Sequence, residues 1–169
     1  GGTSGLGDIN ASFFFGPSAP ASVTWAVGPA LYLPTATDDA LGSGKWSTGP
    51  SVVALAMPGH WVIGALVSNV WSFAGDEDAA DVNSFLFQPI INYNLDDGWY
   101  LTSGPIITAD WEADNDQRWT VPIGMGAGKI LRIGKQPVNV SSHLYYNVEK
   151  PDNVGDWTLR LQFQLMFPK

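Results

Sequence analysis

The sequence predicts an all-β fold, and more narrowly a transmembrane, antiparallel, up-and-down β-barrel, on three observations. Apolar and polar residues alternate with a period of two along most of the chain, which is typical of strands. The predicted connections are alternately short and long, and the long ones are acidic. Tryptophans lie near the ends of the predicted strands and avoid their centres. We therefore treat residues 1–169 as one outer membrane barrel domain.

The alternation predicts nine strands. Most of them match or slightly exceed the roughly 9–11 residues that a tilted strand needs to cross a bilayer. Five prolines fall inside them, and because each removes a ladder donor, we expect bulges or irregular pairing at Pro29, Pro50, Pro89, Pro105 and Pro122. The expected strand ranges are 8–15, 22–33, 45–57, 60–73, 82–94, 99–111, 118–131, 137–149 and 157–167.

The last predicted strand shows the two faces most clearly. Its even positions include Arg160, Gln162 and Gln164. Burying Arg160 in a closed soluble core without a partner would cost several kcal/mol, and a water-filled interior removes that cost. The opposite face is expected to contact lipid, and it consists of Trp157, Leu159, Leu161, Phe163, Leu165 and Phe167.

Other strands fit the same partition. Glycines alternate along 118–131, and small residues on the inner side would leave room or accept a bulky group from across the lumen. Strand 60–73 stays ambiguous, because Asn69 shares its face with Ile63, Val67 and Trp71. The residues predicted to line the lumen are Arg160, Gln162, Gln164, His143, Tyr145, Asn139, Asn147, Arg118, Asp110, Gln88 and Asn92.

The connections divide into two kinds. "GPSAPA", "PGH", "LDDG" and "GKQP" are tight turns, whereas "TATDDALGSG", "AGDEDAAD", "EADNDQ" and "KPDNVGD" are generally longer and acidic. This alternation is typical of a barrel with short periplasmic turns and longer outer loops. Lys129, Arg132, Lys135 and Lys169 lie toward the short turns. Of the 16 acidic residues, those in or beside the long connections are Asp38, Asp39, Asp76, Glu77, Asp78, Asp81, Asp110, Glu112, Asp114, Asp116, Glu149, Asp152 and Asp156.

The eight tryptophans predict an aromatic girdle at each rim. Indole has an apolar body and a polar N–H group, so it favours the interface between lipid and water. Core tryptophans of a β-sandwich are the alternative, which their avoidance of strand centres disfavours. Trp25, Trp61 and Trp99 follow short turns, and the tryptophans beside long connections are Trp46, Trp71, Trp111, Trp119 and Trp157.

Composition excludes some functions. A net charge of −8 argues against a nucleic-acid binder, which needs a basic surface, and the absence of cysteine removes disulfides, thiolate metal sites and thiol nucleophiles. No secretory signal is visible in "GGTSGLGDIN", so the sequence is either mature or a fragment. Single-chain barrels normally have an even number of strands with both ends on the inner side. Nine strands therefore imply either an odd number of strands missing upstream or one strand miscounted here. We favour missing upstream strands, in a larger even-stranded barrel.

Three weaker chemical patterns are present. The loop 75–81 holds four carboxylates that could bind calcium, Asp76, Glu77, Asp78 and Asp81. It lacks the spacing of an EF-hand, so calcium is only a secondary hypothesis. Acidic loops of this kind also suit divalent ions bridging to lipopolysaccharide phosphates.

Ser141 and His143 share one strand face, about 7 Å apart at Cα, which raises a barrel hydrolase, although no oxyanion hole is evident. Arg160, Arg118 and Asp110 are candidates for an electrostatic filter in the lumen. The alternative is a structural ion pair at the rim, with Asp110 and Arg118 facing one another across neighbouring strands.

Several segments resemble the neuromedin U-like outer membrane proteins, a bacterial family overlapping with outer membrane proteins of phenol meta-cleavage pathways. They are "GLGDI" (5–9), "WAVGPALYLPTATDDALGSGKWSTGPSVVAL" (25–55), "WVIGALVSNVWSFAGDED" (61–78), "DVNSFLFQPIINYNL" (81–95), "QRWTVPIGMGAGKILRIGKQPVNV" (117–140) and "DWTLRLQFQLMFPK" (156–169). The resemblance covers nearly the whole chain, matches the family's C-terminal portion, and implies a Gram-negative outer membrane channel or transporter, with aromatic or other hydrophobic compounds as candidate solutes. Phe167 is followed by Pro168 and Lys169, so the terminal aromatic is offset.

These observations lead to ranked hypotheses. The leading one is an outer membrane porin-like barrel that passes small molecules by diffusion and is not an enzyme, with membrane lipid and lipopolysaccharide as its surroundings. The second is a structural or adhesive barrel whose acidic outer loops bind a partner and whose lumen is plugged. A barrel hydrolase is third, and a soluble β-sandwich is the main structural rival.

Overall fold

The computed structural model describes residues 4–19, 21–38, 41–134 and 136–167. It is all-β, with one antiparallel sheet of ten strands, so the predicted fold class is confirmed at that level. The strands follow one another in the sheet in chain order, and β7 pairs with β5 and β8 in line with β6. The bounds are β1 (Ile9–Ser12), β2 (Val23–Leu33), β3 (Lys45–Ala56), β4 (Trp61–Gly75), β5 (Asn83–Asn94), β6 (Trp99–Ser103), β7 (Ile107–Asp110), β8 (Trp119–Ile133), β9 (Gln136–Glu149) and β10 (Trp157–Leu165).

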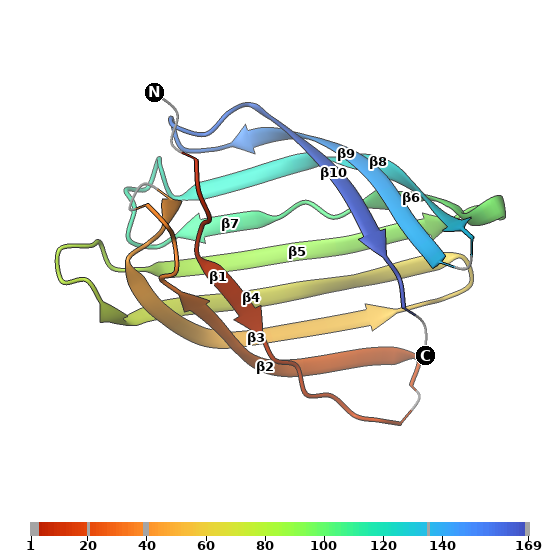
Figure 1. Cartoon of the computed structure of the whole chain (residues 1–169), viewed down its shortest axis with the longest axis horizontal. Coiled ribbons are helices and arrows are strands. Elements are labelled where there is room, and N and C mark those ends of the chain that lie inside the picture. Colours follow the sequence, from red (N-terminus) through yellow and green to blue (C-terminus); the bar gives the residue numbers. More distant parts are fainter. Residues whose placement is uncertain (1–3, 20, 39–40, 135, 168–169) are drawn as a thin grey trace.

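The sheet curls, so that β1 and β10 both lie in front of the central strands in Figure 1. Among the described residues no pairing joins β1 to β10, and each therefore has one free edge. The long connections lie at the left end of Figure 1 and the short turns at the right end. Three of the short turns contain a glycine with positive φ, namely Gly59, Gly98 and Gly134, a conformation that a side chain would strain. Within the described ranges no helix is long and apolar enough to cross a membrane.

The sheet accommodates the five prolines by setting them against one another or at irregularities. Pro29 of β2 is the register partner of Pro50 of β3, and Pro122 lies at a register shift between β8 and β9. The predicted strand 99–111 is interrupted, and residues 104–106 separate β6 from β7. Both pieces pair with β5 in one continuous register, which sets Pro105 opposite Pro89. Two residues without an N–H group therefore meet at the break, which explains why the ladder opens there.

The two faces of the sheet differ in polarity, in the opposite sense to a soluble domain. Among described residues, the fully buried side chains include only five apolar ones and more polar or charged ones: Ser47, Ser51, Ser68, Thr102, Ser141, His143 and Asn147. We call the face that carries most of these buried polar side chains the inner face, and the opposite one the outer face. Along β9, Ser141, His143, Tyr145 and Asn147 are buried, whereas the residues between them are exposed. One exception is Val138, which has the parity of the exposed residues but is buried.

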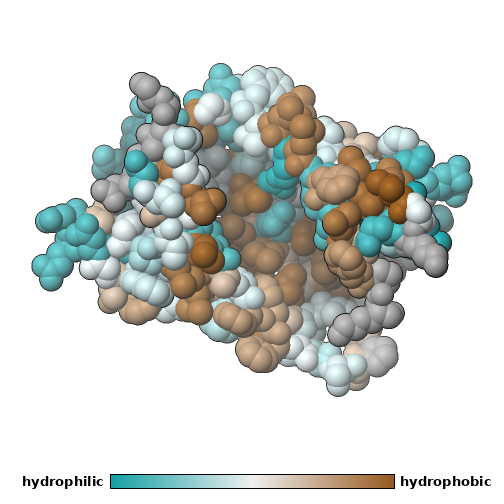
Figure 2. Space-filling model, viewed as in Figure 1, coloured by the Kyte–Doolittle hydropathy of each residue, from teal (hydrophilic) through white to brown (hydrophobic). Residues whose placement is uncertain are grey.

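The ambiguous strand 60–73 follows the same pattern. In β4, Ile63, Val67 and Trp71 are exposed and Ser68 and Val70 are buried, which places the odd positions on the outer face. Figure 2 shows hydrophobic residues gathered in groups over one view of the molecule, with a hollow between them. Hydrophilic residues mark the left end of that view, where Figure 1 places the loop between β4 and β5. Three charged residues of the predicted segregation, Asp39, Lys135 and Lys169, lie outside the described residues.

Candidate functional site on the inner face of the sheet

A column of glycines on β8 is the base of the candidate site. Gly124, Gly126 and Gly128 alternate on its inner face. A Cβ atom added to Gly128 would overlap the ring of Tyr100, and one added to Gly126 would lie 2.8 Å from Cγ of His143. The glycines therefore let larger side chains from neighbouring strands lie flat against the sheet. The expected accommodation of a bulky group is realised, but that group comes from adjacent strands rather than from across the interior.

Two tyrosines cross this column in opposite directions. Tyr100 reaches from β6 over β8, and its hydroxyl donates to Oδ1 of Asn139 on β9 at 2.7 Å. Tyr145 reaches from β9 back over β8, and its hydroxyl accepts a hydrogen bond from the N–H of Gly104 at 3.2 Å. Strand β8 lies between β6 and β9, so the side chains bridge strands that the ladder does not join.

A row of three side chains on β9 continues the network. His143 Nε2 lies 2.9 Å from Ser141 Oγ, and His143 Nδ1 lies 3.2 Å from the Tyr145 hydroxyl. A hydroxyl has one proton and two acceptor positions, so the Tyr145 oxygen serves either tautomer of His143: it donates to a bare Nδ1 or accepts from a protonated one. Ser141 is the complementary partner at Nε2 in each case. The nearest backbone N–H group, that of Gly104, is occupied by Tyr145, and the barrel hydrolase stays a hypothesis.

Arg160 of β10 completes the network at Gly104. Its Nη1 donates to the Gly104 carbonyl at 3.4 Å, and Gln88 Nε2 of β5 donates to the same oxygen at 3.3 Å. The guanidinium carbon lies 5.3 Å from the centroid of the Tyr145 ring, within cation–π distance. At the break between β6 and β7, side chains thus form hydrogen bonds with both the N–H and the carbonyl of Gly104. Neither Gly104 nor Tyr100 was predicted from the sequence. The spacing of the prolines is the signal that could have pointed to Gly104.

The other residues predicted to line the lumen are distributed along the same face. Gln164 Oε1 accepts from Asn139 Nδ2 at 3.5 Å and from Gln162 Nε2 at 3.4 Å. Asn147 is buried near the long connections and donates to the Gly155 carbonyl at 2.7 Å. Asn92 of β5 is half-buried and is the register partner of Thr102. Nine of the predicted residues thus lie on β5, β9 or β10: Arg160, Gln162, Gln164, His143, Tyr145, Asn139, Asn147, Gln88 and Asn92.

Asp110 and Arg118 lie together at the rim, but their side chains do not pair. Both line a hollow of about 450 Å³ beside the loop 150–156. Their backbones are bonded, with Asp110 N–H donating to the Arg118 carbonyl at 2.9 Å. The Arg118 side chain instead donates to the Ala113 carbonyl and lies 5.7 Å from the Trp111 ring. The alternative of an ion pair between them is therefore wrong: among the residues described, the ion pairs are Lys45–Asp81 and Lys150–Asp156.

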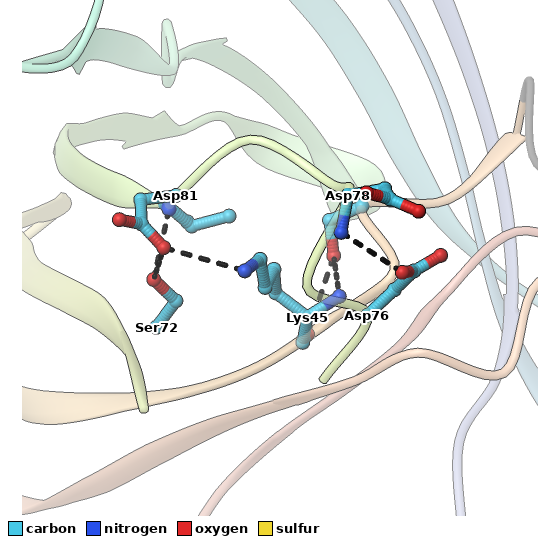
Figure 3. Close-up of polar contacts among 7 residues, drawn as sticks. Lys45, Ser72, Asp76, Asp78 and Asp81 are labelled. Atoms are coloured by element: carbon cyan, nitrogen blue, oxygen red, sulfur yellow. Dashed lines mark hydrogen bonds and ion pairs between the residues drawn. The ribbon is translucent and has the colours of Figure 1, made fainter. Parts of the chain in front are cut away.

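The acidic loops form a second hollow at the same end. Its volume is about 590 Å³, and its lining includes Asp8, Asp38, Asp76, Asp78, Asp81 and Asp110. Figure 3 shows that two carboxylates of the predicted calcium group, those of Asp76 and Asp81, turn to different partners. Asp81 pairs with Lys45 at 3.4 Å, and Asp76 accepts from the N–H of Asp78 at 3.0 Å. Within the described part of the chain no three potential ligands are placed to share a metal ion, and calcium binding stays a prediction.

Asp8 ties the segment before β1 to the first long connection. Its carboxylate accepts the N–H of Ser43 at 2.7 Å, the hydroxyl of Ser43 at 2.9 Å and the N–H of Ala36 at 3.1 Å. The hydrogen bond from the Ser43 backbone is the largest cause of a pKa for Asp8 below its usual value.

The tryptophans lie at both ends of the outer face. Seven of the eight are exposed, and Trp119 is half-buried against Trp111, with ring centroids 5.6 Å apart. Trp111 Nε1 donates to Asn69 Oδ1 at 2.9 Å, and Asn69 Nδ2 donates to Asn83 Oδ1 at 3.0 Å. This explains how an asparagine sits on an apolar face, which the alternation alone could not explain. Trp25, Trp61 and Trp99 lie at the short-turn ends of strands, and the long-loop ends carry Trp46, Trp71, Trp111, Trp119 and Trp157.

Comparison with protein families, with characterised proteins and with solved structures finds no match. The resemblance to the neuromedin U-like family therefore stays a prediction.

Proposed function

We propose that this chain forms a transmembrane β-barrel of the bacterial outer membrane that passes small molecules by diffusion, without covalent chemistry. One observation carries the proposal: polar side chains are buried on the inner face, while large apolar side chains are exposed on the outer face. In water such a surface would favour aggregation, because exposed apolar patches of this extent are rare on soluble monomers. A bilayer outside and water inside suit both faces.

Strand lengths and tryptophan positions support the membrane assignment. Six strands, β2 to β5, β8 and β9, have 11 to 15 residues, enough to cross a bilayer at a tilt. Exposed tryptophans at both ends of the strands suit the two interfaces of a membrane. Lipid offers no hydrogen bonds, so the proposal requires that the free edges of β1 and β10 be paired in the membrane.

The inner network supports a passage rather than a plug. Tyr100 and Tyr145 lie flat over the glycines of β8 and form hydrogen bonds along the wall instead of across the interior. Space between opposite walls is thereby kept for water and solute. The acidic hollow at the long-loop end would form the outer entrance.

Reconstitution into lipid vesicles tests the proposal. The protein should require detergent for purification, and vesicles that contain it should swell in an isosmotic solution of a small sugar. Protein that inserts without causing swelling would favour the adhesive, plugged barrel. Monodisperse protein in buffer without detergent would favour the soluble β-sandwich and end the proposal.

A further inference from the structure

Arg160 carries a positive charge that no carboxylate balances within the part of the chain that the structure describes. Its contacts there are the Gly104 carbonyl at 3.4 Å and the ring of Tyr145 at 5.3 Å. The side chain is half-buried on the inner face of β10. Both contacts are electrically neutral groups, so the charge is solvated and stabilised but not neutralised.

The acidic residues at the rim lie too far away to neutralise it strongly. Arg160 is the register partner of His143, and Glu149 lies six residues further along β9, about 20 Å at roughly 3.3 Å per residue. Asp110 is similarly about 20 Å along the strand direction from Gly104. At physiological salt the Debye length is about 8 Å, so these charges are largely screened from Arg160 where water fills the interior. The nearer Asp156 is paired with Lys150 at 3.4 Å.

The remaining N–H groups of Arg160 suit a carboxylate. A guanidinium has five N–H donors, and the Gly104 carbonyl takes one of them. The guanidinium carbon lies over the Tyr145 ring, and this contact helps to hold the group in place. Gln162 follows on the same face of β10, about 7 Å along the strand, and adds an amide donor. Arg–carboxylate pairs of this kind are frequently bidentate.

We propose that Arg160, held by Tyr145 and Gly104, is a binding site for carboxylate-bearing solutes on the inner face, and that it gives the passage a preference for organic acids. The selectivity part rests on the proposed function, whereas the binding part does not.

Two measurements on the full chain separate the binding from the passage. The first is calorimetric titration of the detergent-solubilised protein with sodium acetate, comparing wild type with Arg160→Gln. Because a hydrogen bond to a charged group is lost, we expect acetate affinity to fall about tenfold. The second is the reversal potential in planar phosphatidylcholine bilayers under a potassium acetate gradient, where Arg160→Gln should reduce the preference for acetate over potassium. Arg132→Gln, at the exposed end of β8, removes the same charge elsewhere and should leave the acetate affinity unchanged.

The outcomes are distinguishable. Unchanged acetate affinity in Arg160→Gln overturns the binding site, whatever the conductance. Acetate binding that depends on Arg160 in a protein that conducts no ions overturns the channel and leaves the site. If Arg160→Gln does not fold, Arg160→Lys keeps the charge and loses the paired donors. Weaker acetate binding by that variant supports the site, and equal binding overturns it.

Discussion

Tyr145 and Tyr146 are adjacent on β9 and have opposite surroundings. Tyr145, on the inner face, is 1% exposed, and its hydroxyl bonds to two partners. Tyr146, on the outer face, is 43% exposed and packs its ring against Trp157 at 5.0 Å. The inner face is thus held by directed hydrogen bonds between strands, and the outer face by ring contacts between close neighbours. Similar substitutions at two consecutive positions should therefore have different effects on stability, and most of the following predictions compare such pairs.

The largest difference is expected for a charge placed on β10. Leu161→Lys puts an ammonium group on the outer face, where lipid would surround it, and should lower the free energy of unfolding by about 2–4 kcal/mol. Gln162→Lys puts the same group on the inner face and should cost less than about 1 kcal/mol, because water is present there. Urea unfolding in lipid vesicles, followed by tryptophan fluorescence, measures both. Equal costs would mean that the two faces meet the same solvent.

The glycine column gives the second contrast. In Gly128→Val the new side chain collides with the Tyr100 ring and breaks the 2.7 Å hydrogen bond to Asn139, so we expect a loss of about 1–3 kcal/mol. Ala127→Val adds methyl groups to the exposed outer face of the same strand and should be close to neutral. Thermal unfolding in detergent compares them. A tolerated valine at 128 would show that Tyr100 need not lie flat.

Removing one hydroxyl gives a smaller effect. Tyr145→Phe leaves His143 Nδ1 and the N–H of Gly104 without their buried partner, at a cost of about 1–2 kcal/mol. Tyr146→Phe keeps the ring contact with Trp157 and should change stability little. Chemical denaturation of the two variants under identical conditions is the measurement, and a greater loss for Tyr146→Phe would contradict the assignment of the faces.

The smallest effect is expected at the rim, at the long-loop end of the sheet. The pKa of Asp8 is lowered in the folded chain, so its carboxylate stabilises the fold above the usual pKa of an aspartate, and that contribution disappears as the pH falls through the lowered value. Asp8→Asn should cost less than about 1 kcal/mol at pH 7, since the site is close to solvent. The difference between wild type and variant should shrink below about pH 4. A difference that stays constant down to pH 2 would exclude a titrating Asp8.

Much of the fold could be predicted from the sequence because it depends on period-two alternation and on local turn chemistry. The ranges of the nine expected strands agree with those observed, with the first shorter and the sixth divided into β6 and β7. Glycines in the short turns, such as Gly59 and Gly134, allow the turn through their own positive φ. Such turns can therefore be recognised from the local sequence alone.

The inner network could not be predicted, because its contacts depend on which strands lie two or three places away in the sheet and at what register. Tyr100 and Asn139 are 39 residues apart in the chain, and Arg160 and Gly104 are 56 apart. Alternation indicates that these side chains share a face but not which of them touch. Asn69 shows the same limit on the outer face, since its partners Asn83 and Trp111 come from two other segments.

The opening at Pro89 and Pro105 provides a reporter within the sheet. The amide of Gly104 is held by a tyrosine hydroxyl, whereas most amides of the neighbouring strands are held by the ladder. Its exchange with deuterium should follow the integrity of the inner wall even while the sheet stays intact. An isotope label at this single glycine would let a spectroscopist observe a solute arriving at Arg160 without altering any side chain.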